Sequence, residues 1–253
     1  MDDTTLLPAT PLSTAERQGL YRAVLTRRDT RGEFLPDTVP DAVLSRILIG
    51  AHYAPSVGFM QPWSFIIIRS PDVRREIHAA FLKANAEAAM LFPHEKRDFY
   101  LSLKLEGIME APVNICVTCD RDRAGPAVIG RTHIRAMDLY SAACAVQNLW
   151  LTARAEGLGV GWVSIFDNGT VQRALNIPKR VVPVAYLCVG KVRGYHRRPE
   201  LESAGWRARL SLDDLIHFDQ WGEQGHDRGL LGRLRRDQTA VGEGRFVDEL
   251  TEE

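Results

Sequence analysis

Four charged side chains, Arg27, Arg28, Asp29 and Arg31, gather around Thr30 in one short segment. Guanidinium groups bind phosphate through paired, planar hydrogen bonds, so the three arginines predict a phosphate-binding segment. A solvated charged turn is the alternative. Asp29 either neutralises its neighbours or acts as a carboxylate base beside a bound ligand.

Two further segments have the composition of ligand-binding loops. Residues 54–63 read APSVGFMQPW, a loop rich in Pro, Gly and small polar groups that leads into an apolar run. Such loops expose backbone N–H and C=O groups to ligands, although a structural turn has the same composition. Gly157, Gly159 and Gly161 precede Ser164. These glycines follow a predicted helix, so they do not match the dinucleotide-binding fingerprint, and a helix stop with a tight turn is the alternative.

The remaining candidates carry less information. Arg207 and Arg209 form a late basic pair that means little alone. No histidine has a partner at ligand or triad spacing, and no serine lies in a nucleophile elbow, so we discard metal and hydrolase chemistry. The four cysteines lie in or beside apolar runs without a second metal-like pair, which predicts buried, reduced thiols and a cytoplasmic protein. They are Cys116, Cys119, Cys144 and Cys188.

The whole-chain properties exclude several classes of protein. The 253 residues are 45% hydrophobic, and 32 basic residues balance 32 acidic ones. A neutral chain has no overall field that attracts nucleic acid or an anionic membrane. No apolar run reaches the roughly 18 residues of a membrane span. Residues 1–14 lack the form of a signal peptide.

The apolar periodicity predicts a sheet flanked by helices in one domain. A final small element is expected at 212–218, and the mixed, Pro-interrupted segment 91–110 is a candidate lid. The helix at 133–156 is apolar around much of its circumference, which indicates burial on more than one side and predicts a homodimer. Helices are expected at 14–28, 40–53, 72–90, 133–156 and 170–176, and strands at 63–69, 113–119, 160–166 and 182–189.

Taken together and in this order, these segments resemble a nitroreductase-type flavoprotein from about Thr14 to Phe218. The resemblance implies an α+β fold with a central mixed sheet and a homodimer with FMN at its interface. It also implies a flavin domain at 14–222, preceded by an expected flexible N-terminus at 1–13. The charged composition of residues 223–253, with few large apolar residues, predicts a tail that is mobile or ordered by a partner. The implied flavin-binding residues are Arg27, Arg28, Asp29, Thr30, Arg31, Ser56, Met60, Gln61, Ser164, Arg207 and Arg209, with the arginines on the phosphate and the loop and Ser164 near the ring.

Three departures from the common family pattern resemble one subfamily, the 5,6-dimethylbenzimidazole synthases. Val57 and Phe59 replace the usual Ser and Asn, and Asp29 replaces a usual Ser. The resemblance implies that reduced FMN is the substrate and dioxygen the co-substrate. The products are then 5,6-dimethylbenzimidazole, the lower ligand of cobalamin, and erythrose 4-phosphate. A separate NAD(P)H-flavin reductase supplies the reduced FMN, Asp29 is the proton acceptor, and Ser164 is a hydrogen-bonding partner of the ring.

Two other functions remain open at this point. The chain could be an FMN-dependent NAD(P)H nitroreductase or oxidoreductase that keeps and recycles its flavin. It could also be a non-enzymatic flavin-binding protein, in which Asp29 only neutralises charge. Steady NAD(P)H consumption with intact flavin distinguishes the first of these from flavin destruction.

Overall fold

The computed structural model describes residue 6, residues 9–224 and residues 228–250. Parts of the predicted N-terminal segment and of the predicted tail therefore lie outside the described residues. The chain divides into two compact units. One consists of residues 27–199, and the other joins residues 1–26 to residues 200–253. The predicted domain boundaries at residues 14 and 222 stay a prediction.

The unit formed by residues 27–199 contains the sheet and most of the helices. The predicted elements are present, with ends that differ by a few residues. The largest difference is at the long helix, which begins at Met137 and not at His133. In chain order the elements are α2 (Asp41–His52), η1 (Val57–Phe59), β1 (Trp63–Ile68), α3 (Pro71–Ala89), α4 (His94–Ser102), β2 (Val113–Asp120), α5 (Met137–Ala155), β3 (Leu158–Val163), α6 (Asn168–Ala174) and β4 (Val181–Lys191).

The four strands form one sheet in the order β1-β2-β4-β3, and every neighbouring pair is antiparallel. The α+β class is confirmed, but the mixed sheet needs a correction. Among the described residues, parallel pairing is limited to an isolated bridge between Asp29 and Val160, at the edge of β3. The register of β2 on β4 shifts between Val117 and Thr118, opposite Pro183. Proline lacks the N–H of a regular ladder and is accommodated at such a bulge.

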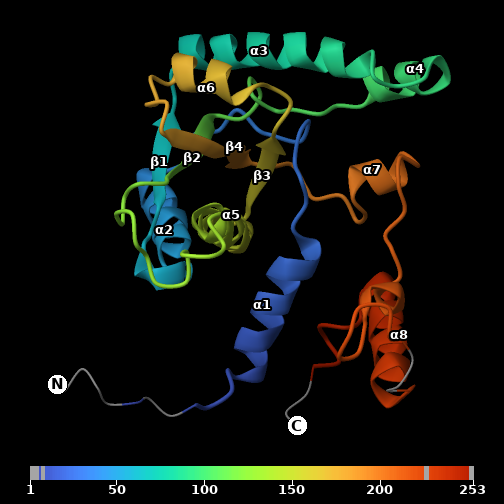
Figure 1. The fold of residues 1–253 in the computed structure, drawn as a ribbon. Helices are drawn as coiled ribbons and strands as arrows, with labels where there is room; N and C mark the ends of the chain where they lie inside the picture. Colours follow the sequence, from blue (N-terminus) through green and yellow to red (C-terminus); the bar gives the residue numbers. More distant parts are fainter. Residues whose placement is uncertain (1–5, 7–8, 225–227, 251–253) are drawn as a thin grey trace. The chain divides into compact units, whose positions relative to one another are not determined.

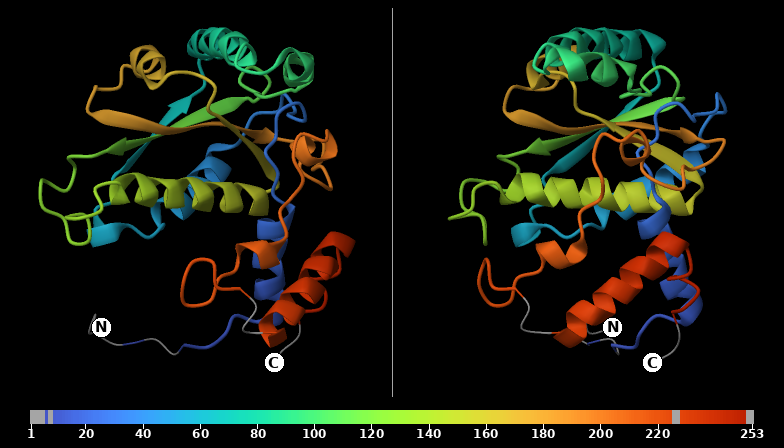
Figure 2. Two further views of the ribbon diagram at one scale, coloured as in Figure 1. Left: turned by 45° about the vertical axis from the view of Figure 1, so that its right-hand side comes forward. Right: turned by 90° about the vertical axis from the view of Figure 1, so that its right-hand side faces the viewer.

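Helices cover both faces of the sheet, as the views in Figure 1 and Figure 2 show. On one face α2 and α5 bury a core that includes Ile47, Val146 and Leu149. On the other face α3 and α6 contribute Ile77, Phe81 and Val171 to a second core. The long helix α5 ends at Ala155, and Gly157 follows it with a φ of 78° that favours glycine. It therefore delivers the chain directly into β3.

The cysteines differ from the prediction in one case. Cys116, Cys119 and Cys188 are buried free thiols, whereas Cys144 is exposed on α5. Burial raises the pKa of Cys116 to about 12. The apolar run around Cys144 does not bury every side of the helix within this chain, so the prediction of a buried thiol is wrong at this position.

In the described part of the second unit there are four elements: α1 (Thr14–Thr26), α7 (Glu200–Ser203), η2 (Leu212–Leu215) and α8 (Arg228–Glu243). Tyr21 of α1 meets Phe246 edge-to-face with ring centroids 5.8 Å apart. The helix α8 lies inside the predicted tail, and the mobility of that tail stays a prediction. Among the described residues no helix is both long and apolar enough to cross a membrane.

Candidate functional site

The segment Arg27–Arg31, here called the arginine segment, runs along the free edge of β3. The Thr30 N–H donates to the Val160 carbonyl at 3.0 Å. Two residues further along β3, the Trp162 N–H donates to Asp29 Oδ1 at 2.8 Å. Backbone and side chain of this segment therefore occupy the hydrogen-bonding groups that an edge strand otherwise leaves open.

The glycines of β3 make this close approach possible. A Cβ atom at Gly161 would lie 2.1 Å from the Thr30 carbonyl oxygen. A Cβ atom at Gly159 would lie 2.9 Å from Thr30 Oγ1. Gly157 is the expected helix stop, but Gly161 serves contact with the backbone of Thr30, and Gly159 makes room for the side chains of Thr30 and Val192. The structure thus joins two of the motifs that the sequence singled out.

Both carboxylate oxygens of Asp29 have fixed partners. Oδ1 accepts from the Trp162 N–H, and Oδ2 accepts from the Arg31 guanidinium at 2.6 Å. Arg31 is buried, while the side chain of Asp29 is 34% exposed. The carboxylate is therefore oriented by the protein but still accessible from one side. Such a group can accept a proton from a ligand placed against the edge of β3.

Trp150 of α5 holds the start of the arginine segment. The Arg27 guanidinium lies over its ring, 5.2 Å from the centroid, and Trp150 Nε1 donates to the Arg28 carbonyl at 3.3 Å. The Nε of Arg27 is buried and finds no hydrogen-bond acceptor among the described residues. An unpaired buried donor costs free energy, so an anionic ligand is the partner that its chemistry fits. The phosphate of FMN is such a ligand.

The side chain of Arg28 binds backbone groups of its own chain. Its guanidinium donates to the carbonyls of Arg27, at 2.7 Å, and Arg197, at 2.5 Å. These bonds tie the arginine segment to the loop that follows β4. Arg28 therefore orients the segment through backbone contacts.

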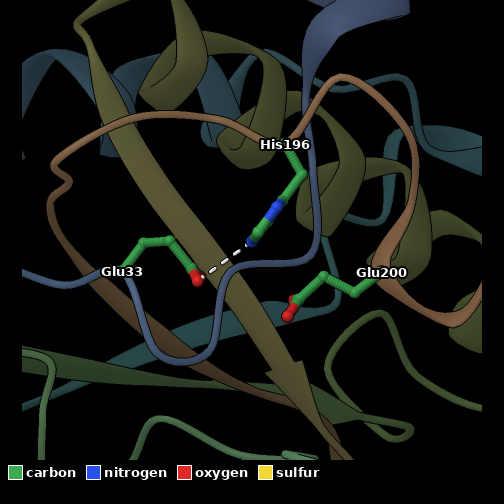
Figure 3. Close-up of side chains that lie close together, drawn as sticks. All are labelled: Glu33, His196 and Glu200. Carbon is green, nitrogen blue, oxygen red and sulfur yellow. Dashed lines mark hydrogen bonds and ion pairs between the residues drawn. The ribbon is translucent and has the colours of Figure 1, made fainter. Parts of the chain in front are cut away.

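Glu33 and His196 form a second tie that the sequence did not reveal. His196 Nε2 and Glu33 Oε1 are 3.0 Å apart, and the two side chains point toward each other in Figure 3. Glu33 Oε2 accepts from the Arg31 N–H at 3.3 Å. Burial raises the pKa of Glu33, but the bonds from His196 and Arg31 outweigh it and the net pKa is lowered. Because 163 positions separate the pair, spacing could not have signalled it.

Residues 54–62, here called the Pro-Ser loop, are held by hydrogen bonds of Ser56, Val57 and Gln61, whereas Phe59 is exposed. Ser56 Oγ accepts from the Gln61 N–H at 3.1 Å, and the Val57 N–H donates to Ser141 Oγ at 3.2 Å. Met60 is buried. Phe59 is 83% exposed although its φ is 49°, a left-handed conformation that bulky residues rarely adopt.

The Pro-Ser loop and the arginine segment contact different parts of α5. The loop is bonded to Ser141, and the segment is bonded to Trp150. These two positions are roughly 14 Å apart along the helix, at about 1.5 Å per residue. Within this unit the structure therefore joins the arginine segment to the glycine strand but not to the Pro-Ser loop.

The other predicted site residues lie in three further parts of the chain. Ser164 is exposed just beyond β3, on a small pocket that Trp162 and Tyr186 also line. Arg207 and Arg209 are exposed residues of the second unit. Their role at a phosphate stays a prediction. The candidate lid 91–110 contains α4, and its closing role also stays a prediction.

Comparison with known proteins identifies the relatives of this chain. The nitroreductase family model matches residues 24–191. A 5,6-dimethylbenzimidazole synthase from Rhodospirillum rubrum is 42% identical over 193 residues, which cover 76% of this chain and 91% of that protein. A second, from Rhodobacter capsulatus, is 39% identical over 197 residues, covering 78% and 95%.

Solved structures support the fold. Iodotyrosine deiodinase bound to FMN and 3-iodo-L-tyrosine has a TM-score of 0.63 at 19% identity, covering 80% of this chain and 100% of that chain. A nitroreductase family protein from Clostridium novyi NT has a TM-score of 0.54 at 20% identity, covering 81% and 96%. At these identities the likeness concerns the fold alone.

Proposed function

Because the chain belongs to the nitroreductase family, we propose that its arginine segment and β3 form part of an FMN site and that the protein is a 5,6-dimethylbenzimidazole synthase. It is an enzyme that fragments reduced FMN with dioxygen to 5,6-dimethylbenzimidazole and erythrose 4-phosphate. Relatives with that name at 42% and 39% identity support the assignment.

The single observation that carries the chemistry is the fixed carboxylate of Asp29. Its two oxygens are oriented by the Trp162 N–H and the Arg31 guanidinium. An ordinary flavin reductase passes hydride through the flavin and has no need of a base there. Fragmentation of the flavin requires protons to leave the ribityl chain and the ring, and Asp29 is the group positioned to accept them. Ser164 offers a hydroxyl to the ring.

The residues present fit FMN at its phosphate end. The buried, unpaired Nε of Arg27 and the guanidinium of Arg31 supply donors of the type that phosphate prefers. The bound FMN supplies the redox-active ring that reacts with dioxygen. The proposal also includes a homodimer, with the Pro-Ser loop near the ring; within one unit that loop and the arginine segment contact different parts of α5.

The flavin-binding part of the proposal is tested by Arg27→Ala. Losing a charged hydrogen bond to phosphate should weaken FMN binding by on the order of 1–3 kcal/mol. Fluorescence titration of FMN measures it. If the affinity is unchanged, Arg27 does not hold the phosphate.

The reaction itself is tested in a single turnover. The protein is loaded anaerobically with chemically reduced FMN, given a pulse of oxygen and analysed by mass spectrometry. The proposal expects 5,6-dimethylbenzimidazole and the loss of one flavin per site. Quantitative return of oxidised FMN without product would contradict the proposal. A second assay with FMN and NAD(P)H then separates the two alternatives: steady NAD(P)H consumption with intact flavin identifies a flavin-recycling oxidoreductase, and no NAD(P)H turnover identifies a binding protein.

The partner reductase is tested separately. The proposal expects that NAD(P)H alone gives no product and that adding a flavin reductase restores it. Product formation from NAD(P)H without the second enzyme would show that this chain reduces its own flavin.

A further inference from the structure

A cavity of about 440 Å³ lies in the segment between β2 and the start of α5. It belongs to residues 121–138, which include none of the proposed flavin-binding residues. Three arginines line it, Arg121, Arg131 and Arg135, together with the carboxylates of Asp122 and Asp138. The cavity wall therefore carries more positive than negative charge.

Arg121 and Arg131 are held in place by the buried carboxylate of Asp138, whose side chain is 1% exposed. Asp138 Oδ2 is 3.0 Å from Arg121 Nε and 3.3 Å from Arg131 NH1. Arg121 also donates to the Arg135 carbonyl at 2.8 Å. A guanidinium carries five N–H donors, so Arg121 retains donors beyond these bonds. Its orientation is fixed before any ligand arrives.

Arg135 differs from the other two arginines. Its side chain makes no hydrogen bond or ion pair with any residue in the described part of the chain. Asp138 is shared by the other two arginines, which leaves no carboxylate to neutralise Arg135 apart from the exposed Asp122. A multiply charged anion is the ligand that such a wall recognises.

The rest of the lining limits the kind of anion. The apolar lining residues are Pro126 and Ala127, and none of the residues that line the cavity is aromatic. The lining therefore offers a nucleobase or flavin ring no aromatic surface on which to stack. The volume is in the range of roughly 300–1,000 Å³ that small-molecule sites occupy, and is larger than a bare phosphate needs. We propose that this cavity binds a phosphorylated sugar or polyol, with the phosphate on Arg121 and Arg135.

The experiment uses protein saturated with FMN, so that the proposed flavin phosphate site is already filled. Ribose 5-phosphate is titrated by isothermal calorimetry, with ribose and adenosine 5′-monophosphate as comparison ligands. The variant is Arg135→Gln. The matched control is Arg180→Gln, because Arg180 pairs with Asp120 at 3.3 Å but does not line the cavity.

The expected result is saturable binding of ribose 5-phosphate without release of FMN, and no binding of ribose. Arg135→Gln should weaken it by on the order of tenfold or more, the effect of a lost charged hydrogen bond. Arg180→Gln should leave the affinity unchanged, and adenosine monophosphate should bind no more tightly than the sugar phosphate. Arg135→Gln is expected to fold, since its guanidinium contacts no described residue, so loss of binding reports on the site.

Four outcomes would overturn the proposal. One is the absence of saturable binding, and another is an equal effect of Arg135→Gln and Arg180→Gln, which would indicate general charge attraction. The third is displacement of FMN by ribose 5-phosphate, which would place the binding in the flavin site. Much tighter binding of adenosine monophosphate would also contradict the sugar-phosphate class.

Discussion

The arginine segment and the Pro-Ser loop are both candidates for the flavin site, but the contacts that hold them differ. The arginine segment is docked on β3 through Thr30 and Asp29, in contact with glycines that no larger residue could replace without displacement. The Pro-Ser loop is bonded near its ends and leaves Phe59 exposed in a strained conformation. The arginine segment is therefore the preorganised half of the proposed site, because contacts within its own chain fix it. The Pro-Ser loop is the outward half, because it exposes the side chain of Phe59. Strained, outward-facing residues cluster where a ligand or partner completes the structure.

The largest effect is expected from Asp29→Asn, which tests whether the preorganised half performs chemistry. Asparagine keeps the size of the side chain and an oxygen for the Trp162 N–H but removes the basic carboxylate. A positioned general base contributes a rate factor of about 10²–10⁴. We expect reduced FMN to bind as before and the single-turnover rate of product formation to fall by that factor. Rates equal to the unsubstituted protein would leave Asp29 only a charge-neutralising role.

The next largest effect is expected from Gly161→Ala, which tests the docking of the arginine segment. The new Cβ would lie 2.1 Å from the Thr30 carbonyl oxygen, so Thr30 or β3 must move. Overpacking of this kind costs about 1–3 kcal/mol of the free energy of unfolding. Chemical denaturation measures it, and FMN affinity should fall with it.

Gly32→Ala is the matched control for this substitution. Gly32 lies one residue beyond the arginine segment, has no left-handed φ, and a Cβ there would meet no atom within 4 Å. The free energy of unfolding of the Gly32→Ala variant should stay within about 1 kcal/mol of that of the unsubstituted protein. Equal losses for the two substitutions would mean that close approach to Thr30 is not what requires glycine at position 161.

Local periodicity and composition predicted a sheet flanked by helices, the principal helices and strands, and the arginine and glycine motifs. They could not predict that Asp29 pairs with the Trp162 N–H or that Glu33 pairs with His196, since both contacts join distant positions. The family resemblance implied the α+β class correctly but a mixed sheet wrongly, because strand direction depends on how the connections cross in space. Cys144 was predicted buried because an apolar helix does not reveal which side its own chain covers.

A third prediction concerns the outward half. Phe59→Ala should leave the unfolding free energy of the monomer within about 0.5 kcal/mol, as expected for an exposed residue. If a partner chain buries Phe59, the same change should weaken the dimer by about 1.5–3 kcal/mol. Sedimentation equilibrium over a range of concentrations separates the two effects. A loss of monomer stability with unchanged association would contradict the contrast between the two halves.

The smallest effect is expected from Glu33→Gln, which removes one tie of the preorganised half. Burial raises the pKa of Glu33, and the bonds from His196 and the Arg31 N–H more than offset it, so the folded-state pKa lies below the usual value of 4.5. A lowered folded pKa means that the ionised group stabilises the native state above the unfolded pKa, and that this contribution is lost as the pH falls through the folded pKa.

At pH 7 the unsubstituted protein should therefore be more stable than Glu33→Gln by about 1 kcal/mol. The difference should shrink once the pH drops below about 4.5, where the glutamate of the unfolded chain is protonated, and vanish below the folded pKa. Urea denaturation at several pH values measures it, with His196→Gln as the companion variant. If Glu33 and His196 act as one tie, the double variant should lose less than the sum of the single losses. A stability difference that is the same at pH 7 and pH 3 would show that the charge of Glu33 does not stabilise the segment, and that the docking on β3 alone preorganises it.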